Sequence, residues 1–437
     1  MAGVALIAAA LCFQWNRFGT ALGGSFVQDG VSFFFKILFL LATFFILFMV
    51  RQYQSQIKRG HAEFTLLILF ALVGMTFVAS ANDFLLFFVA LETLTVSLTV
   101  MTAYLRDKTA SIEAGLKYII LGALSTGVFL YGLSFIYGAT GSTSYEAIRA
   151  RLELLPSVPA SFTFGMVLVV ASLCFKISAV PFQMWAPDVY EGAPTPVTAT
   201  LAIASKTAGF AALLRLLLTV FAQSETNLTF LLGILAALSI VYGNLGAIPQ
   251  TNVKRLLGYS SIGHAGYLLI GLAAFSSSGA EAVLFYLLSY VFSTAGVFLV
   301  LVALSRHAKT DEISGLAGLS KRSPILAAGL LLALLSLAGV PPLGGFFAKF
   351  YVLWSGVQAG LLWLVVIGAL NVITSLYYYL KIVKAMYLEK PLEDTALRVT
   401  QAQKAMQYFS IFGILALGIF QGPFVRFAEL ALKNLVR

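Results

Sequence analysis

The feature that most constrains the fold is the recurrence of long apolar runs along almost the whole chain. A run of about 18 residues or more can cross the roughly 30 Å hydrocarbon core of a bilayer as a helix. Of the 437 residues, 60% are hydrophobic and only 11% are charged, well outside the usual range of soluble domains. The sequence therefore predicts an all-α polytopic membrane protein with no sizeable soluble domain.

The apolar runs predict about thirteen transmembrane helices. The first run has no basic leader and no small-residue cleavage site after it, so we do not expect it to be a removable signal peptide. The expected spans are residues 2–18, 31–50, 62–80, 83–104, 114–138, 161–187, 195–221, 228–248, 254–275, 281–304, 323–354, 359–385 and 404–432.

Basic residues gather in the even-numbered loops between these spans, whereas the odd-numbered loops are nearly neutral. The net charge of +10 therefore indicates membrane topology rather than nucleic-acid binding. The positive-inside rule places the N-terminus and the even-numbered loops in the cytoplasm and the C-terminus on the far side of the membrane. The basic residues concerned are Arg51, Lys58, Arg59, Arg106, Lys108, Lys254, Arg255, Arg306, Lys309, Lys321, Arg322, Lys381, Lys384, Lys390, Arg398 and Lys404.

Two spans are interrupted deep inside their apolar runs. Pro181 removes a backbone donor in one of them, and the sequence GVPPLGG breaks the other at residues 339–345. Paired interruptions in two halves of a chain indicate inverted repeats of a transporter. We expect one membrane domain, 1–437, with N-terminal helices at 1–60. Two inverted five-helix repeats follow at 61–221 and 228–385, each with a broken helix, and a C-terminal helix covers 404–437.

Buried charges accompany these interruptions. Lys176 precedes the first break, Lys206 lies in the following span, and Lys349 follows the second break. A lysine deep in a bilayer is costly, which favours a proton-carrying role, although the same residues could instead stabilise the opened helices.

Three further residues are candidates for the proton path. Glu92 lies near the middle of its span, and Lys117 on the next span is its natural partner. The alternatives are a structural ion pair or a permanently protonated acid for Glu92, and snorkelling for Lys117. His264 carries protons near neutral pH and has Ser260 and Ser261 beside it, but a lone histidine can also be a packing residue.

Other polar residues have simpler interpretations. Lys36, Arg215 and Lys381 lie near span ends and are predicted to snorkel to the membrane surface. The run Tyr377–Tyr379 is interpreted as packing or as an interfacial belt. Cys12 and Cys174 both lie in apolar runs, and no iron–sulfur or nucleotide motif is present. We therefore expect no redox cofactor or metal in this chain.

The stretches FKISAVPFQMWAPDVYEGAPTPVTATLAIASK, QTNVKRLLGYSSIGHAGYLL and LSLAGVPPLGGFFAKFYVL resemble the antiporter-like membrane subunits of respiratory complex I, the proton-translocating NADH–quinone oxidoreductase. The resemblance covers most of residues 60–385. It implies that flavin (FMN), iron–sulfur clusters and quinone belong to partner subunits. It also implies site roles: a glutamate at Glu92, its interacting lysine at Lys117, the broken-helix lysine at Lys176, a central lysine at Lys206 and an exit-path lysine at Lys349.

Together these residues suggest a path. Protons would pass from the cytoplasm to Lys176 and Lys206, then past His264 to Lys349, with Glu92 and Lys117 as a switch. The main alternative is a stand-alone cation/proton antiporter subunit, and a third is a passive scaffold. The sequences PDVYEGAPTPV and TNVKRLLGYSSI favour the complex I subunit over the stand-alone antiporter.

Two departures from the family pattern are expected to matter. The chain begins at what would be the family's second span, so the start is late or the first helix is absent. Gln183 stands where some relatives have a histidine, and a glutamine there can only hydrogen-bond water.

Overall fold

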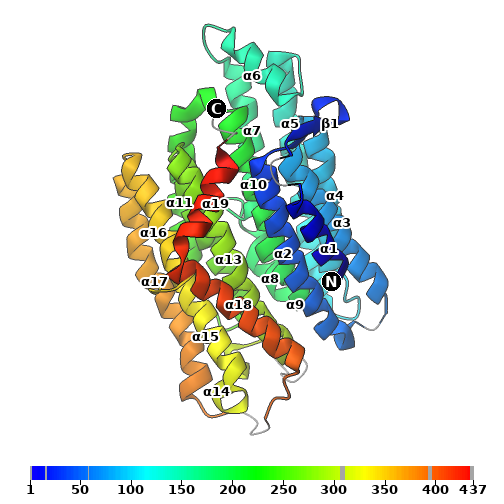
Figure 1. Ribbon diagram of the computed structural model, residues 1–437, viewed down its shortest axis with the longest axis vertical. Coiled ribbons are helices and arrows are strands. Elements are labelled where there is room, and N and C mark those ends of the chain that lie inside the picture. The colour runs from blue at the N-terminus through cyan, green and yellow to red at the C-terminus, as the bar shows by residue number, and fades with distance from the viewer. Residues whose placement is uncertain (1, 15–16, 58, 306–310, 392–395, 434–437) are drawn as a thin grey trace.

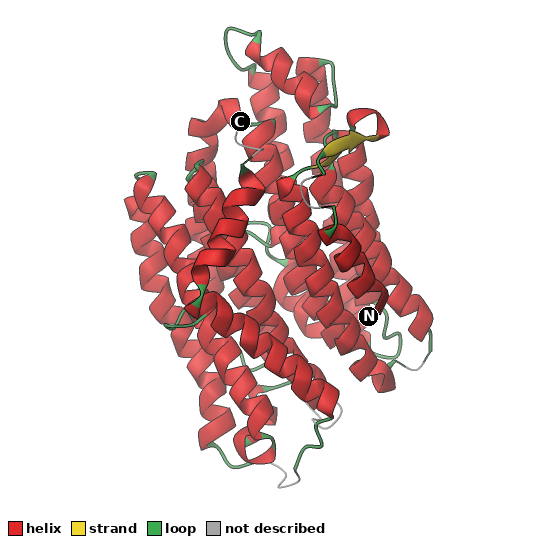
Figure 2. Cartoon of the chain, in the orientation of Figure 1, coloured by secondary structure: helices red, strands yellow, loops and turns green. Residues whose placement is uncertain are grey.

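The computed structural model describes residues 2–14, 17–57, 59–305, 311–391 and 396–433, and its described part is almost entirely helical (Figures 1 and 2). One small antiparallel hairpin joins β1 (Gly19–Ala21) to β2 (Phe26–Gln28). The helices of the N-terminal part and first half are α1 (Ala2–Cys12), α2 (Gly30–Tyr53), α3 (His61–Ser80), α4 (Phe84–Thr102), α5 (Thr109–Thr140), α6 (Tyr145–Glu153), α7 (Ala160–Ile177), α8 (Trp185–Gly192), α9 (Thr195–Thr200) and α10 (Lys206–Thr219).

A π-helical turn, η3 (Leu201–Ser205), joins α9 to α10 without a break, so the three form one span. Short 3-10 turns lie at η1 (Leu22–Gly24), η2 (Gln54–Gln56), η4 (Ala222–Ser224) and η5 (Ile313–Leu316). The remaining helices are α11 (Glu225–Ala247), α12 (Val253–Ala273), α13 (Ser277–Leu304), α14 (Leu319–Arg322), α15 (Pro324–Ala338), α16 (Gly344–Gln358), α17 (Leu362–Leu388), α18 (Gln401–Ile419) and α19 (Gln421–Leu432).

The even-numbered loops meet at one end of the helix bundle, which we call the even-loop end. Backbone hydrogen bonds join Val253 to Asp311, Gly318 to Ala385 and Leu397 to Arg322. At the opposite, odd-loop end, the loop before α4 bonds to the hairpin and to the loop before α6. The basic loops therefore lie together at the even-loop end. Lys58, Arg306 and Lys309, three of the basic residues in that pattern, lie outside the described residues.

Ten helices in the described part are long and apolar enough to cross a membrane, or eleven if the bent pair α18–α19 is one span. The expected count of thirteen is therefore not confirmed. The two spans in question are α1 and the pair α15–α16. Helix α1 has 11 residues, which reach only about 16 Å, and the halves of the broken pair have 15 residues each.

Both expected helix breaks are present, and the first half of each broken helix ends in the same way. Helix α7 stops at Ser178, whose φ of 60° is left-handed, and α15 stops at Gly339 with a φ of 90°. The amide of the residue after each of these bonds back to a carbonyl five residues earlier, which is the Schellman arrangement of helix ends. Each break thus satisfies part of the backbone that it opens inside the apolar region.

The C-terminal span is bent, which the sequence analysis missed. Helices α18 and α19 meet at an angle of 85°. Pro423 lies in the first turn of α19, where a missing amide is tolerated, but it could not sit inside a helix continuing from α18 because its ring would clash with the preceding turn. The expected continuous helix at 404–432 is therefore wrong.

The prediction that Arg215 and Lys36 snorkel is also wrong. Arg215 is buried in α10 and donates two hydrogen bonds, each of 2.9 Å, to the two carboxylate oxygens of Asp29. Asp29 is the N-cap of α2, so this pair ties the two helices together at the odd-loop end. Lys36 is buried as well and donates to the side chain of Gln28. Position along a span does not reveal which face of the helix a residue occupies.

Candidate functional site

The first break positions Lys176 in the protein interior. The residue is buried at the last turn of α7, and its amine donates a 2.6 Å hydrogen bond to the hydroxyl of Thr95 on α4. Thr95 lies one helical turn from Glu92, so the two residues share a face of α4. The structure therefore places Glu92 and Lys176 on either side of Thr95.

Glu92 and Lys117 do not pair in the structure. A carboxylate oxygen of Glu92 accepts a 2.7 Å hydrogen bond from Thr126 on α5. Lys117 lies nine residues before Thr126 on the same helix, about 13.5 Å along its axis. Its half-exposed amine instead contacts Asp188 at 2.6 Å and Glu113 at 2.8 Å.

Asp188 belongs to a charged cluster at the even-loop end. It accepts a 2.7 Å hydrogen bond from Arg255 on α12, and the same guanidinium contacts Glu191 at 2.8 Å. Helix α8 thus carries two carboxylates that meet cations from both α5 and α12. This cluster links the second half of the first broken helix to both halves of the chain.

Lys206 follows directly after the π-helical turn η3 and is almost fully buried. Its amine donates to both the backbone carbonyl and the hydroxyl of Ser261 on α12. The Ser261 hydroxyl also lies 3.1 Å from that of Tyr190 and 3.4 Å from that of Tyr290. Single π-helical turns are frequently found at functional sites, and this one sets the position of Lys206.

His264 lies one turn beyond Ser261 on α12 and is buried among hydroxyl groups. Its Nδ1 is 2.7 Å from the hydroxyl of Tyr286, and its Nε2 is 3.2 Å from that of Tyr379. The Tyr379 hydroxyl also contacts Ser260. Tyr379 is buried, in line with the packing interpretation, but its hydroxyl also belongs to this polar group, whereas Tyr377 is exposed.

Lys349 is buried beside the second break. Its amine donates a 2.9 Å hydrogen bond to the carbonyl of Ala338, the last residue of α15, and lies 3.4 Å from the hydroxyl of Ser375. It also lies 4.9 Å from the centre of the Tyr267 ring. A cation at the C-terminal end of a helix is favoured by the helix dipole. Lys349 thus caps the half-helix from which its own half has been separated.

A small cavity connects His264 to Lys349. It has a volume of about 10 Å³, roughly what one water molecule needs, and Tyr286, Ser289 and Ser336 also line it. The Ser289 hydroxyl is buried and has no hydrogen-bond partner among the described residues. Polar, hydroxyl-lined space of this kind suits a bridging water between the histidine and the lysine.

Lys206, Ser261, His264 and Lys349 therefore form one buried polar series, while Lys176 and Glu92 form a second group at the first break. Sequence reasoning missed Tyr190, Tyr286, Tyr290 and Tyr379, because aromatic residues in apolar runs look like packing. Within the described residues, no group of three or more His, Cys, Asp or Glu side chains could hold a metal ion. The arrangement suits the movement of protons between neutral and charged side chains.

Comparison with known proteins gives a consistent result. Residues 81–375 match the family described as NADH:quinone oxidoreductase/Mrp antiporter, TM. A protein named NADH-quinone oxidoreductase subunit N from Desulforamulus reducens is 41% identical over 432 residues, covering 99% of this chain and 90% of that protein. One of the same name from Parvibaculum lavamentivorans is 45% identical over 390 residues, covering 89% and 80%.

Solved structures show the same fold. A chain of respiratory complex I from Thermus thermophilus, solved with bound aureothin, superposes with a TM-score of 0.83 at 36% identity, covering 97% of this chain and 91% of that one. A chain of the Mrp complex from Dietzia sp. DQ12-45-1b has a TM-score of 0.89 at 22% identity, covering 100% and 91%, which shows a shared fold. The chain belongs to the NADH:quinone oxidoreductase/Mrp antiporter family of transmembrane subunits.

Proposed function

We propose that this chain is a membrane-arm subunit of an NADH–quinone oxidoreductase and translocates protons, driven by electron transfer that other subunits carry out. The observation that carries the proposal is the buried polar series in which Lys206 contacts Ser261, Ser261 contacts Tyr290, and Tyr290 lines the cavity together with His264 and Lys349. Its relatives named subunit N align over nearly the whole chain. The stand-alone antiporter remains the second candidate, because the Mrp complex chain shares the fold.

The proposed path begins at the even-loop end and ends at the odd-loop end. Protons reach Lys176, pass to Lys206, and cross by way of Ser261 and His264 to Lys349. The two broken helices belong to two five-helix repeats, 61–221 and 228–385, within one membrane domain. Moving one charge against 100 mV costs about 2.3 kcal/mol, which a change of about two pKa units in a carrier can offset.

The proposed switch between Glu92 and Lys117 needs a different form, because the two residues do not contact each other. Glu92 lies one helical turn from Thr95, the residue that accepts the hydrogen bond of Lys176. Lys117 is held by Asp188 instead of Glu92. We propose that exchange of Lys117 between these carboxylates changes how strongly Glu92 holds the proton on Lys176.

The proposal also covers the orientation of the chain in the membrane and its partner subunits. The even-numbered loops face the cytoplasm and the C-terminus faces the periplasm of a bacterial inner membrane, because the basic loops gather at one end. The partners are the other membrane and peripheral subunits of the complex. FMN, iron–sulfur clusters and the quinone site belong to those partners.

Purification from the native membrane tests this function. We expect the chain to co-purify with subunits that carry flavin and iron–sulfur clusters. Proteoliposomes of that preparation should acidify one compartment on addition of NADH and a quinone. Sodium/proton exchange by the chain in the absence of redox partners would instead establish the antiporter alternative.

Tyr379 provides a test of the path with a matched control. Tyr379→Phe removes the hydroxyl that contacts both His264 and Ser260, so we expect NADH-driven proton translocation to fall about tenfold. Tyr377→Phe, two residues away and 62% exposed, should leave the rate unchanged. Equal rates in both variants would remove Tyr379 from the path.

A further inference from the structure

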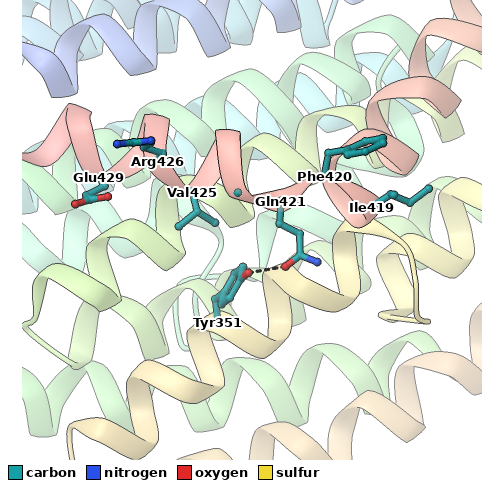
Figure 3. Close-up of a pocket in the computed structure, with 8 residues that line it drawn as sticks. Tyr351, Ile419, Phe420, Gln421, Val425, Arg426 and Glu429 are labelled. Carbon is teal, nitrogen blue, oxygen red and sulfur yellow. Dashed lines mark hydrogen bonds between the residues drawn. The ribbon is translucent and has the colours of Figure 1, made fainter.

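The bend between α18 and α19 opens a groove on the surface of the helix bundle. The groove has a volume of about 520 Å³ and lies between α16 and the bent pair. Figure 3 shows Tyr351 and Gln421 pointing toward each other across it, with Arg426 and Glu429 farther along α19. The Tyr351 hydroxyl donates a 2.6 Å hydrogen bond to Gln421. The bend therefore places polar and charged groups in a span that is otherwise apolar.

This third bend needs an explanation, as the two helix breaks did. An interrupted helix at membrane depth is tolerated only where it is buried in protein or lines a wet cavity. At this bend, Gln421 donates to the carbonyl of Gly418 at 3.2 Å and so satisfies one group of the ending helix. Arg426 and Glu429 are exposed on α19, and exposed charges in a span require water or a partner. The groove is therefore expected to contain water.

The groove lies directly behind the second break. Gly418 on α18 packs against the segment from Pro342 to Gly344 so closely that a Cβ there would overlap the Pro342 carbonyl. On the other side, a Cβ at Gly344 would lie 2.8 Å from Cβ of Leu417 and 3.1 Å from the hydroxyl of Ser289. Ser289 lines the cavity that holds Lys349. The first turn of α16 therefore contacts Ser289 of the cavity on one side and Leu417 and Gly418, next to the bend, on the other.

Acidic groups continue the polar series toward the odd-loop end. Glu429 interacts electrostatically with Glu281, which lies in the first two turns of α13 at that end. Carboxylates that lie near each other and near water can accept and release protons. Tyr351, Gln421 and Glu429 therefore line the groove, and Glu429 lies near Glu281 at the odd-loop end.

We propose that the groove between α16 and α19 is the outlet of the proton path. A proton leaves the Lys349 ammonium, passes through water at Ser289 and at the Tyr351–Gln421 pair, and reaches Glu429 and the solvent at the odd-loop end. The only bonds that change are N–H and O–H bonds, and Lys349 is left as a neutral amine. This inference rests on the proposed function and adds the route of release.

Thiol labelling in the intact complex tests whether the groove is wet. In a Cys12→Ser background, Val425→Cys places a thiol on the groove wall, whereas Phe412→Cys places one on an exposed apolar position of α18 outside it. A membrane-impermeant thiol reagent should label Val425→Cys from the odd-loop side and leave Phe412→Cys unlabelled. Absence of labelling at Val425→Cys, equal labelling of both positions, or labelling only from the even-loop side would overturn the outlet.

Transport measurements test whether the groove carries protons. Gln421→Leu removes the relay, and we expect NADH-driven proton translocation to fall about tenfold. Gln421→Glu keeps a proton-accepting group and should retain most of the rate. A full rate in Gln421→Leu, or equal losses in both variants, would contradict the outlet. Lys206→Met, measured in parallel, separates the hypotheses: if it pumps fully, the proposed function fails, and if only Gln421→Leu pumps fully, the outlet alone fails.

Discussion

Replacing Lys206 with methionine is expected to lower NADH-driven proton translocation by about a hundredfold, with quinone reduction falling in step. The physical reason is that Lys206 joins the two halves of the chain. Its amine makes the hydrogen bonds to Ser261, and no other lysine among the described residues contacts that serine. Methionine has a similar volume, so the tightly packed span should still fold and assemble.

The measurement is acid release by vesicles that contain the assembled complex. Lys381→Met is the matched control, because Lys381 is a half-buried lysine at the even-loop end whose amine, among the described residues, donates to the carbonyl of Gln250 and to none of the path residues. We expect this variant to pump at the normal rate. Full pumping by Lys206→Met in an assembled complex would rule out the proposed path.

The largest expected effect on stability is at the Asp29–Arg215 pair. Arg215→Met leaves the Asp29 carboxylate buried without its partner, which costs about 3–5 kcal/mol. We expect a lower midpoint of thermal unfolding in detergent and less assembled complex. The double variant Asp29→Asn with Arg215→Met removes both charges and should recover much of the loss.

Arg149→Met is the control, since the exposed Arg149–Glu153 pair contributes at most about 1 kcal/mol. An unchanged unfolding midpoint in Arg215→Met would show that the buried pair does not stabilise the fold.

The contribution of the Asp29–Arg215 pair to the free energy of unfolding also depends on pH. Burial acts to raise the pKa of Asp29, but the charge and hydrogen bonds of Arg215 outweigh it and hold that pKa below its usual range. The contribution is therefore complete above about pH 4 and is lost as pH falls further.

Much of the architecture could be predicted because apolar run length, proline and loop charge are local signals. Pro181 and the sequence at 339–345 located both helix breaks. The basic residues identified the loops that lie together at the even-loop end. The bend at Phe420 was missed because QGP at 421–423 has no charge to draw attention to it. The N-terminal hairpin was missed because residues 19–28 fall in the short loop between the first two expected spans, where no secondary structure was assigned.

The candidate site could be predicted in its lysines but not in its partners. A charge in an apolar run is visible in the sequence, whereas the partner depends on which helix faces it in three dimensions. Lys117 was paired with Glu92 because their spans are neighbours, but Lys117 lies nine positions before Thr126, the Glu92 partner, and contacts Asp188 instead. Tyr379 was hidden for a similar reason: its neighbours Tyr377 and Tyr378 point in other directions, each about 100° apart around the helix.

The span that carries Lys206 is held firmly on one side of the lysine and is wound more loosely on the other. Nine residues beyond Lys206, Arg215 fastens the helix to Asp29 and to the carbonyl of Ala79. On the other side of Lys206, the π-helical turn η3 winds the chain more loosely than an α-helix does. We therefore expect any displacement of Lys206 to be taken up by η3 and α9, because the odd-loop half of the span is held by Arg215.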